Sequence, residues 1–356
     1  MELMSFLLKN LSYFQCFAAE HGGALGDLCI PLCFKDRLTN ITCRAHHMEK
    51  TMVFGGAFQN TSYIFKVPKE TTYTLHSNHI DEFEFLKSVK EIAKYRFNVT
   101  LNTTTAVRLT QMRYDPDYML YNRKTEKLNT WNLILDNEYL AMALYEQYDV
   151  FPKLFGACGT MYYAEMLNPI GDYTHYFSMQ DDIHYFRLCV KIALMILRYL
   201  QEIEKLPEPV NFCEVKLNNF GLTMDIKKIK YLDLDSVHPR GVINQMLANW
   251  SPCVDHSDCD KHDCRSFCNQ VTKKCQYGLA NNNLQIVCEK IFLGWMLSKK
   301  VMVPGLLVSI HAPDQLMDLL ENCANPAHET TMPRAKASQE IYNRLYTMLE
   351  HIFQTV

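Results

Sequence analysis

The order of elements along the 356-residue chain predicts an α+β fold, with a small sheet-bearing lobe followed by a larger helical lobe. Strand patterns come first, in MVFGGAFQNTSYIFKV and in FPKLFGACGTMYYAEML, where short apolar runs flank a polar or glycine turn. The strongest helix pattern follows in QDDIHYFRLCVKIALMILRYLQEIEKL, where apolar residues recur every three or four positions until Pro207 and Pro209 stop it. Because 48% of the residues are apolar or aromatic, both lobes can hold a hydrophobic core.

The remaining segments divide the chain into three expected parts. Residues 1–52 form a cysteine-bearing cap with a turn at HGGALGD. Residues 53–167 form the small lobe, with a polar insert at about 68–128 and a helix in TWNLILDNEYLAMALYEQY. Residues 168–356 form the helical lobe, which carries a cysteine-rich segment at 251–288 and helices from NNLQIVCEKIFLGWML onward.

The charge pattern excludes two classes of partner. A net charge of −3 gives no electrostatic reason to expect a nucleic acid or an anionic membrane. A membrane helix is not expected either, because the apolar run VKIALMILRYL carries Lys191 and Arg198. This charge is still compatible with a small anionic ligand, but only at a local site, and membrane attachment is expected only through an anchor outside this chain.

Fourteen cysteines are many for a chain of this length, and ten of them cluster in two segments. Such clusters indicate disulfides in an oxidising compartment or metal ligands in a reducing one. The zinc alternative has His256 and His262 beside six cysteines, but the spacing C-x5-C-x4-C-x3-C-x6-C-x12-C lacks the paired C-x2-C of common zinc sites. Disulfides are therefore favoured, with their connectivity open because six cysteines allow 15 pairings. The disulfide candidates are Cys16, Cys29, Cys33, Cys43, Cys253, Cys259, Cys264, Cys268, Cys275 and Cys288.

Six N-x-S/T sequons occur, against roughly two expected from the composition. This excess predicts a glycosylated chain in the lumen of the endoplasmic reticulum or the secretory pathway. The first residues, MELMSFLLKNLSYFQCF, have an acid at position 2 and no basic n-region, so we expect the targeting segment to be cryptic or to lie outside this chain. The glycosylation candidates are Asn10, Asn40, Asn60, Asn98, Asn102 and Asn249.

The stretch CEVKLNNFGLTMDIKKIKYLDLDSV, residues 213–237, has the spacing of a phosphoryl-transfer site. Such a site needs a carboxylate to orient the attacking hydroxyl and oxygen ligands for a divalent metal. In protein kinases a catalytic loop supplies the carboxylate and, five residues later, an asparagine, and an aspartate follows a short strand. Glu214 and Asn219 stand at that spacing, and Asp233 follows the strand-like KIKYL, with Asp235 as an assisting acid. We therefore predict that Glu214 orients the acceptor and that Asn219 and Asp233 hold Mg²⁺ or Mn²⁺.

Residues upstream fall in the order that an ATP site needs. Lys66 ends the strand of YIFK and would hold the α/β-phosphates, while Gly55 and Gly56 in the preceding strand would cover them. Glu138, in the helix before FPKLFGACG, would pair with Lys66, and Glu165 sits where a hinge would meet the adenine. Lys66 and Glu138 each have a plainer interpretation as an exposed polar residue, and only the order of the whole set favours the nucleotide site.

Several of these segments together resemble the divergent protein kinase domain family, the cysteine-rich kinase-like proteins of the endoplasmic reticulum, and most closely its first subgroup. The resemblance rests on GDLCIPLCFKDRLTNITC, NEYLAMALYEQYDVFPKLFGACG, CEVKLNNFGL, KIKYLDLDSV, CVDHSDCDKHDCRSFCNQVTKKC and NNNLQIVCEKIF. It implies a two-lobed protein-kinase-like fold with a cysteine-rich N-terminal cap and a cysteine-rich insertion in the second lobe. It also implies a type II membrane anchor ahead of the lumenal domain in a longer form.

The chain departs from this family at two places. Glu214 stands where the family has an aspartate, one methylene shorter, which puts turnover in doubt but not nucleotide binding. Members of the subgroup often carry an EF-hand in the small lobe, and here the corresponding region is MRYDPDYMLYNRKTEKLN. Asp115, Asp117 and Glu126 fit loop positions 1, 3 and 12, but Met119 and Leu120 stand where an oxygen ligand and the turn glycine are needed. We therefore do not expect Ca²⁺ binding.

The leading functional prediction is a kinase of the secretory pathway that transfers the γ-phosphoryl group of ATP to a hydroxyl of an unknown protein or glycan. The alternative is a catalytically weak pseudokinase, a disulfide-stabilised lumenal or secreted module for binding or signalling. Glu214 is the feature that favours this alternative. A third interpretation, a cytosolic zinc-binding adaptor, fits the absent signal peptide but not the sequon excess.

Overall fold

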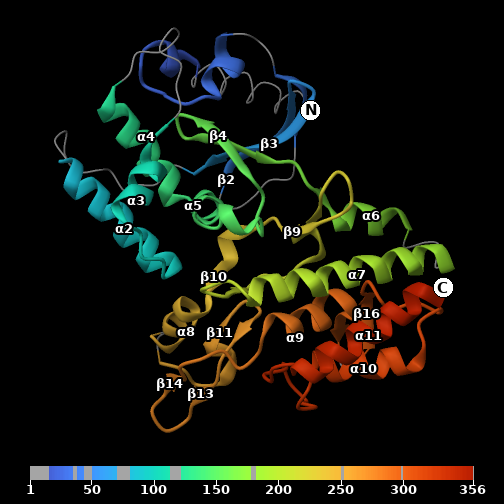
Figure 1. Ribbon diagram of the computed structural model, residues 1–356. Helices are drawn as coiled ribbons and strands as arrows, with labels where there is room; N and C mark the ends of the chain where they lie inside the picture. The colour runs from blue at the N-terminus through green and yellow to red at the C-terminus, as the bar shows by residue number, and fades with distance from the viewer. Residues whose placement is uncertain are drawn as a thin grey trace. The chain divides into compact units, whose positions relative to one another are not determined.

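The computed structural model describes residues 16–34, 38–43, 50–69, 81–112, 122–177, 182–249, 252–297 and 300–355 (Figure 1). The chain divides into two compact units, Met1–Met166 and Leu167–Val356. The first holds a five-stranded sheet with helices, and the second is mainly helical with several short strand pairs. This mixture confirms the predicted α+β class. Among the described residues, no helix is both long enough and apolar enough to cross a bilayer.

The sheet of the first unit is antiparallel, with the strand order β1-β2-β3-β5-β4. Its strands are β1 (Thr39–Cys43), β2 (Lys50–Phe58), β3 (Thr61–Pro68), β4 (Leu154–Cys158) and β5 (Met161–Glu165). Both predicted strand pairs are confirmed. Gln59 and Asn60 join β2 to β3 with φ values of 50° and 62°, the left-handed turn that suits a two-residue hairpin.

One face of the sheet packs against the cap, residues 16–34, which ends in η1 (Ile30–Phe34). Phe54 and Phe65 stack with ring centroids 4.9 Å apart and share a core cluster with Leu28 of the cap. Gly26 allows the cap to cross β4 closely, since it has φ +141° and an added Cβ would lie 1.8 Å from the Ala157 carbonyl oxygen. Two disulfides fix the arrangement, Cys16–Cys33 within the cap and Cys29–Cys158 between the cap and β4.

The expected polar insert at about 68–128 contains helices that the sequence analysis did not predict. The helices of the first unit are α2 (Glu82–Phe97), α3 (Thr103–Thr110), α4 (Arg123–Leu135), α5 (Asn137–Leu144) and η2 (Glu146–Tyr148). α2 buries Phe85, Val89, Ala93 and Phe97, which recur every four residues along one stripe. The single helix predicted over residues 130–148 is divided into α4 and α5. The break falls at Asp136, whose Oδ1 accepts a hydrogen bond from the Tyr139 amide at 2.8 Å and caps α5.

The second unit is built around the predicted long helix, α7. Apart from the short elements between residues 256 and 275, its elements are β6 (Asn168–Pro169), α6 (Ile170–Phe177), α7 (Ile183–Glu204), β7 (Val210–Phe212), η3 (Leu217–Asn219), β8 (Phe220–Leu222), β9 (Ile229–Tyr231), η4 (Leu234–Ser236), β10 (Val237–Pro239), α8 (Arg240–Ala248), α9 (Asn283–Val287), η6 (Cys288–Phe292), β15 (Gly294–Leu297), β16 (Lys300–Pro304), α10 (Asp314–Ala324) and α11 (Gln339–Thr355).

Figure 1 shows α11 running beside α7, where the Tyr342 hydroxyl donates to the Leu197 carbonyl oxygen at 3.3 Å. The helix predicted through NNLQIVCEKIFLGWML is only partly correct. It ends before Gly294, whose φ of +88° stops a helix, and GWML is strand β15.

The cysteine-rich segment consists of η5 (His256–Cys259), β11 (Asp260–Lys261), β12 (Cys264–Arg265), β13 (Cys268–Asn269) and β14 (Lys274–Cys275). Cys253–Cys268 and Cys259–Cys275 are its internal disulfides. Cys213–Cys264 and Cys288–Cys323 connect it to the rest of the unit. Buried ion pairs also anchor it, Arg265 with Glu289 at 2.8 Å and Arg334 with Asp260.

Nine of the ten disulfide candidates are paired in the structure, in six disulfides. The tenth, Cys43, ends β1, where only its backbone is described. The sequence analysis missed three partners, Cys158, Cys213 and Cys323. Six disulfides indicate an oxidising environment, and they leave the paired sulfurs of the segment unavailable as zinc ligands.

Candidate functional site

The structure brings Lys66 and Glu138 together in the first unit. Lys66 lies on β3, and its Nζ is 2.9 Å from Oε1 and 2.8 Å from Oε2 of Glu138, near the start of α5. The Glu138 side chain is 1% exposed, whereas that of Lys66 is 15% exposed. Glu138 is therefore a buried anchor, and Lys66 is the member of the pair that a ligand can reach.

A second lysine, which the sequence analysis did not single out, lies in the same cluster. Lys50 Nζ is 2.8 Å from Asp136 Oδ2 and 3.1 Å from Glu138 Oε2, and its side chain is 1% exposed. The Tyr162 hydroxyl lies 3.1 Å from Asp136 Oδ1 and 3.2 Å from Glu138 Oε2. Side chains from β2, β3 and β5 thus hold the first turn of α5.

The predicted glycines and the predicted hinge residue each have a local structural role. Gly55 and Gly56 lie in the buried middle of β2, away from the hairpin turn, and an added Cβ on Gly56 would come within 3.2 Å of Phe65. This close packing already explains a glycine at position 56. Glu165 ends β5, and its carboxylate accepts a hydrogen bond from the Lys153 amide at 3.1 Å.

The second unit brings Asn219 and Asp233 together beside the backbone of Glu214. β8 and β9 form an antiparallel hairpin, with Phe220 opposite Tyr231, so the residues flanking its open end lie side by side. Asn219 Nδ2 lies 3.4 Å from Asp233 Oδ2 and donates to the Glu214 carbonyl oxygen at 2.9 Å.

The Glu214 carboxylate is ionised and held by neighbours. Lys216 donates a hydrogen bond to it, and the Ser236 hydroxyl donates at 3.3 Å. The Lys216 hydrogen bond holds the pKa of Glu214 below its ordinary value, and Glu214 in turn raises the pKa of Lys216. The sequence analysis missed Lys216. The sequence feature that could have identified Lys216 is a positive charge two residues after the expected catalytic carboxylate.

Asn219 and Asp233 carry side chains of the types that divalent cations use as oxygen ligands. Both are buried, at 9% and 8% exposure. The amide nitrogen of Asn219 donates its hydrogen bonds within the protein, to the Glu214 carbonyl oxygen and to the Tyr231 hydroxyl. An amide oxygen and a carboxylate are the oxygen ligands that Mg²⁺ and Mn²⁺ prefer. Asp235 follows within η4, two residues along the chain.

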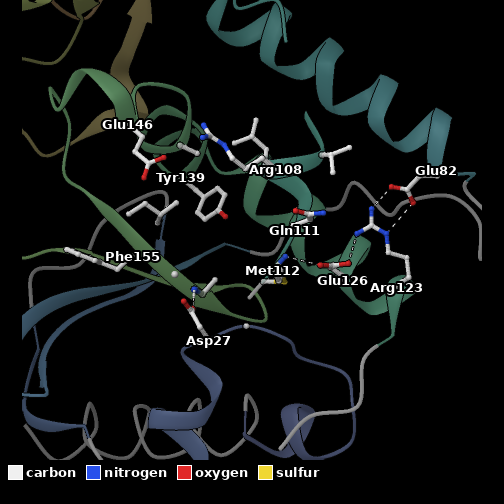
Figure 2. Close-up of a pocket in the computed structure, with 17 residues that line it drawn as sticks. Asp27, Glu82, Arg108, Gln111, Met112, Arg123, Glu126, Tyr139, Glu146 and Phe155 are labelled. Carbon is white, nitrogen blue, oxygen red and sulfur yellow. Dashed lines mark hydrogen bonds and ion pairs between the residues drawn. The ribbon is translucent and has the colours of Figure 1, made fainter. Parts of the chain in front are cut away.

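A separate cavity of about 840 Å³ lies in the first unit between the cap, α3, α5 and β4. Figure 2 shows the guanidinium of Arg123 between the carboxylates of Glu82 and Glu126 at its wall. Glu126, a residue considered for calcium binding, also accepts a hydrogen bond from the Met112 amide at 2.8 Å. The other positions considered for that loop, residues 115, 117, 119 and 120, lie outside the described residues.

All of the glycosylation candidates that the structure describes are exposed. They are Asn40, Asn60, Asn98, Asn102 and Asn249. Asn10 lies outside the described residues. Exposure is what enzymatic attachment of a glycan requires, so each of the five positions is sterically suited to it.

Residues 130–326, more than half of the chain, match a family model described as the protein-kinase domain of FAM69. The matched range contains Glu138, the Glu214 loop and Asp233. Lys66 and Lys50 precede it.

Proposed function

The chain belongs to the family of FAM69 protein-kinase domains, and on this premise we propose that it is a secretory-pathway kinase that transfers the γ-phosphoryl group of ATP to a hydroxyl of a protein or glycan. Membership makes the chain a kinase or a pseudokinase, and kinase-like domains in general use ATP and a divalent metal. The lumen of the endoplasmic reticulum or of the secretory pathway is the proposed location, supported by six disulfides and exposed sequons. A longer form could also carry a membrane anchor.

The Lys66–Glu138 ion pair is the observation that carries the proposal. It joins residues 72 positions apart, one on a strand and one near the start of a helix, in the arrangement that kinases use to present a lysine to the α/β-phosphates. Glu138 is buried and forms ion pairs with two lysines, Lys50 and Lys66, so it holds the Lys66 side chain in place. Lys66 would bind the phosphates of ATP.

Asn219 and Asp233 would hold Mg²⁺ or Mn²⁺, which when bound neutralises charge on the phosphates. Glu214 would orient the acceptor hydroxyl, and Lys216 would offset the negative charge that spreads over the transferred group. The acceptor oxygen bonds to the γ-phosphorus while the bond to the β–γ bridging oxygen breaks. ADP leaves with that oxygen, and the hydroxyl proton passes to the Glu214 carboxylate.

The rival function is a pseudokinase that binds nucleotide without turnover. The Glu214–Lys216 ion pair favours it, because a carboxylate with a lowered pKa is a weaker base. The extra methylene of Glu214 also moves the carboxylate relative to the aspartate of the family.

Nucleotide binding is tested first by thermal unfolding of the glycosylated protein with and without ATP and Mg²⁺ or Mn²⁺. A ligand that binds only the folded state at 100 times its dissociation constant adds about 2.7 kcal/mol. We expect a metal-dependent rise in melting temperature that Asp233→Ala abolishes. Asp225→Ala is the matched control, because Asp225 is an exposed carboxylate in the turn of the same hairpin. Absence of any shift at millimolar nucleotide would refute the nucleotide site.

Measurements of ADP release then distinguish a kinase from a pseudokinase. For a kinase, ADP release with an added acceptor should fall by about 10²- to 10⁴-fold in Glu214→Gln. Glu214→Asp should retain or raise the rate. For a pseudokinase, nucleotide binding persists while ADP release stays at the background of Asp233→Ala, whatever stands at position 214.

A further inference from the structure

Lys50 lies on the same face of the sheet as Lys66 only because β2 contains a bulge. The pairing of β2 with β3 runs regularly from Phe58 to Met52 and then shifts, so that Lys50 stands opposite Pro68. Side chains alternate along a strand, so Pro68 shares the face of Lys66. Without the extra residue, Thr51, the side chain of Lys50 would point to the opposite face, toward the cap. Bulges of this kind re-aim side chains near active sites.

The re-aimed lysine completes a charge-balanced cluster. Two ammonium groups, Lys50 and Lys66, meet two carboxylates, Asp136 and Glu138. Lys50 and Asp136 form the deep pair, with side chains 1% and 4% exposed. Lys50 also contacts Glu138 Oε2, the oxygen that Lys66 approaches at 2.8 Å. Glu138 therefore shares its charge between two cations, and Lys66 is the one at the exposed edge.

We propose that Lys50 is a positioning residue for the nucleotide site, because it compensates Asp136 and Glu138 from the β2 side and so leaves the charge of Lys66 available to phosphate. This inference rests on the proposed ATP binding. Lys50 itself is too buried to touch a nucleotide. Without it, two buried carboxylates would share the single ammonium of Lys66 and draw it inward, since buried charges are stable only when paired.

The test uses Lys50→Met, in which the buried charge is lost, and Lys50→Met/Asp136→Asn, in which the cluster is neutral again. Asparagine caps a helix as well as aspartate does, so the double variant keeps the start of α5. Val89→Ala is the control for general loss of stability, because Val89 is fully buried in α2 and is not part of the cluster. Two quantities are measured, the dissociation constant of ATP–Mg²⁺ by calorimetry and the rate at which an amine-acylating reagent labels Lys66 in the absence of nucleotide.

We expect Lys50→Met to weaken ATP–Mg²⁺ binding and to slow labelling of Lys66, each by about tenfold or more. The double variant should recover most of both losses, and Val89→Ala should change neither. Unchanged affinity and labelling in Lys50→Met would overturn the inference and leave Lys50 a structural residue. If the wild-type protein binds no nucleotide, the proposed function is refuted. The labelling rates still show in that case whether Lys50 positions Lys66, so the two failures can be distinguished.

Discussion

The Val215 amide donates a hydrogen bond to the Asp263 carboxylate at 2.8 Å, which joins the residue after Glu214 to the cysteine-rich segment. The Asp263 amide donates back to the Cys213 carbonyl oxygen at 2.9 Å, and Cys213 forms a disulfide with Cys264. Glu214 is thus flanked by two tethered residues. The cysteine-rich segment acts as a covalent brace for the loop that carries the proposed acceptor-orienting carboxylate.

Removing the Cys213–Cys264 disulfide should lower the stability of the fold and also loosen the loop that carries Glu214. Cys213→Ser/Cys264→Ser opens a 51-residue link and should cost about 4 kcal/mol of unfolding free energy in the chain-entropy account. We expect the Val215 amide to lose protection from hydrogen exchange and phosphoryl transfer to fall, while ATP–Mg²⁺ affinity stays close to that of wild type. Hydrogen exchange followed by mass spectrometry gives the first quantity.

The matched control is Cys253→Ser/Cys268→Ser, which opens a 15-residue link within the same segment and should cost about 3 kcal/mol. Its effect on the Val215 amide should be small. Equal loss of protection in the two variants would show that the segment acts as a whole and that the Cys213–Cys264 link has no special role.

Acid should destabilise the second unit through His238. Its Nε2 is buried and has no hydrogen-bond partner among the described residues, and burial, with the charges of Lys261 and His262, lowers its pKa to about 4 from 6.5. The unfolded chain therefore binds a proton that the folded chain does not, so stability falls as pH falls from about 6.5 toward 4. The full loss is about 3 kcal/mol.

His238→Gln should flatten the pH dependence of the unfolding free energy over this range. His351→Gln is the control, because His351 is exposed on α11. Chemical unfolding at a series of pH values measures both. A slope that persists in His238→Gln would assign the acid sensitivity to another group.

Asn102 serves as a helix cap and as a glycosylation candidate, and two substitutions separate these roles. Its Oδ1 accepts a hydrogen bond from the Thr105 amide at 2.7 Å at the start of α3. Thr104→Ala removes the sequon and keeps the cap, whereas Asn102→Ala removes both. Both variants should lose one glycosidase-sensitive mass step. Asn102→Ala should lose about 1 kcal/mol more of unfolding free energy than Thr104→Ala. Unchanged mass in both would exclude glycosylation at this position.

Local patterns in the sequence were enough to predict the family, the strand hairpins and α7. α7 has an uninterrupted apolar stripe and a proline stop, so its pattern needs no tertiary information. The roles predicted for Lys66, Glu214 and Asp233 stay predictions, although the structure places Lys66 against Glu138 and Asp233 beside Asn219. α2 was missed because its four buried positions are separated by charged residues that resemble a polar insert.

Other features depended on contacts that one-dimensional spacing does not contain. The face on which Lys50 lies is set by a register shift, and a bulge of one residue leaves no mark in the strand pattern. The disulfide pairings could not be predicted either, because they too depend on contacts in three dimensions. Cys264 pairs with Cys213 outside the cysteine cluster, so counting within the cluster could not have found the link.

The Cys29–Cys158 disulfide also sets an order of events during synthesis. Cys33 follows Cys16 by 17 residues, so their pair can form as soon as the cap is made, but Cys29 has to wait for a partner that is 129 residues further along. At translation rates of about 5 to 20 residues per second, that wait is roughly 6 to 26 seconds. During that time Cys29 is a free thiol, and Cys16, Cys33 and Cys43 have already been made and can form a wrong disulfide with it. Correct maturation of the first unit therefore depends on thiol exchange that outlasts its own translation, and a shortage of disulfide isomerase should show first as chains mispaired in the cap.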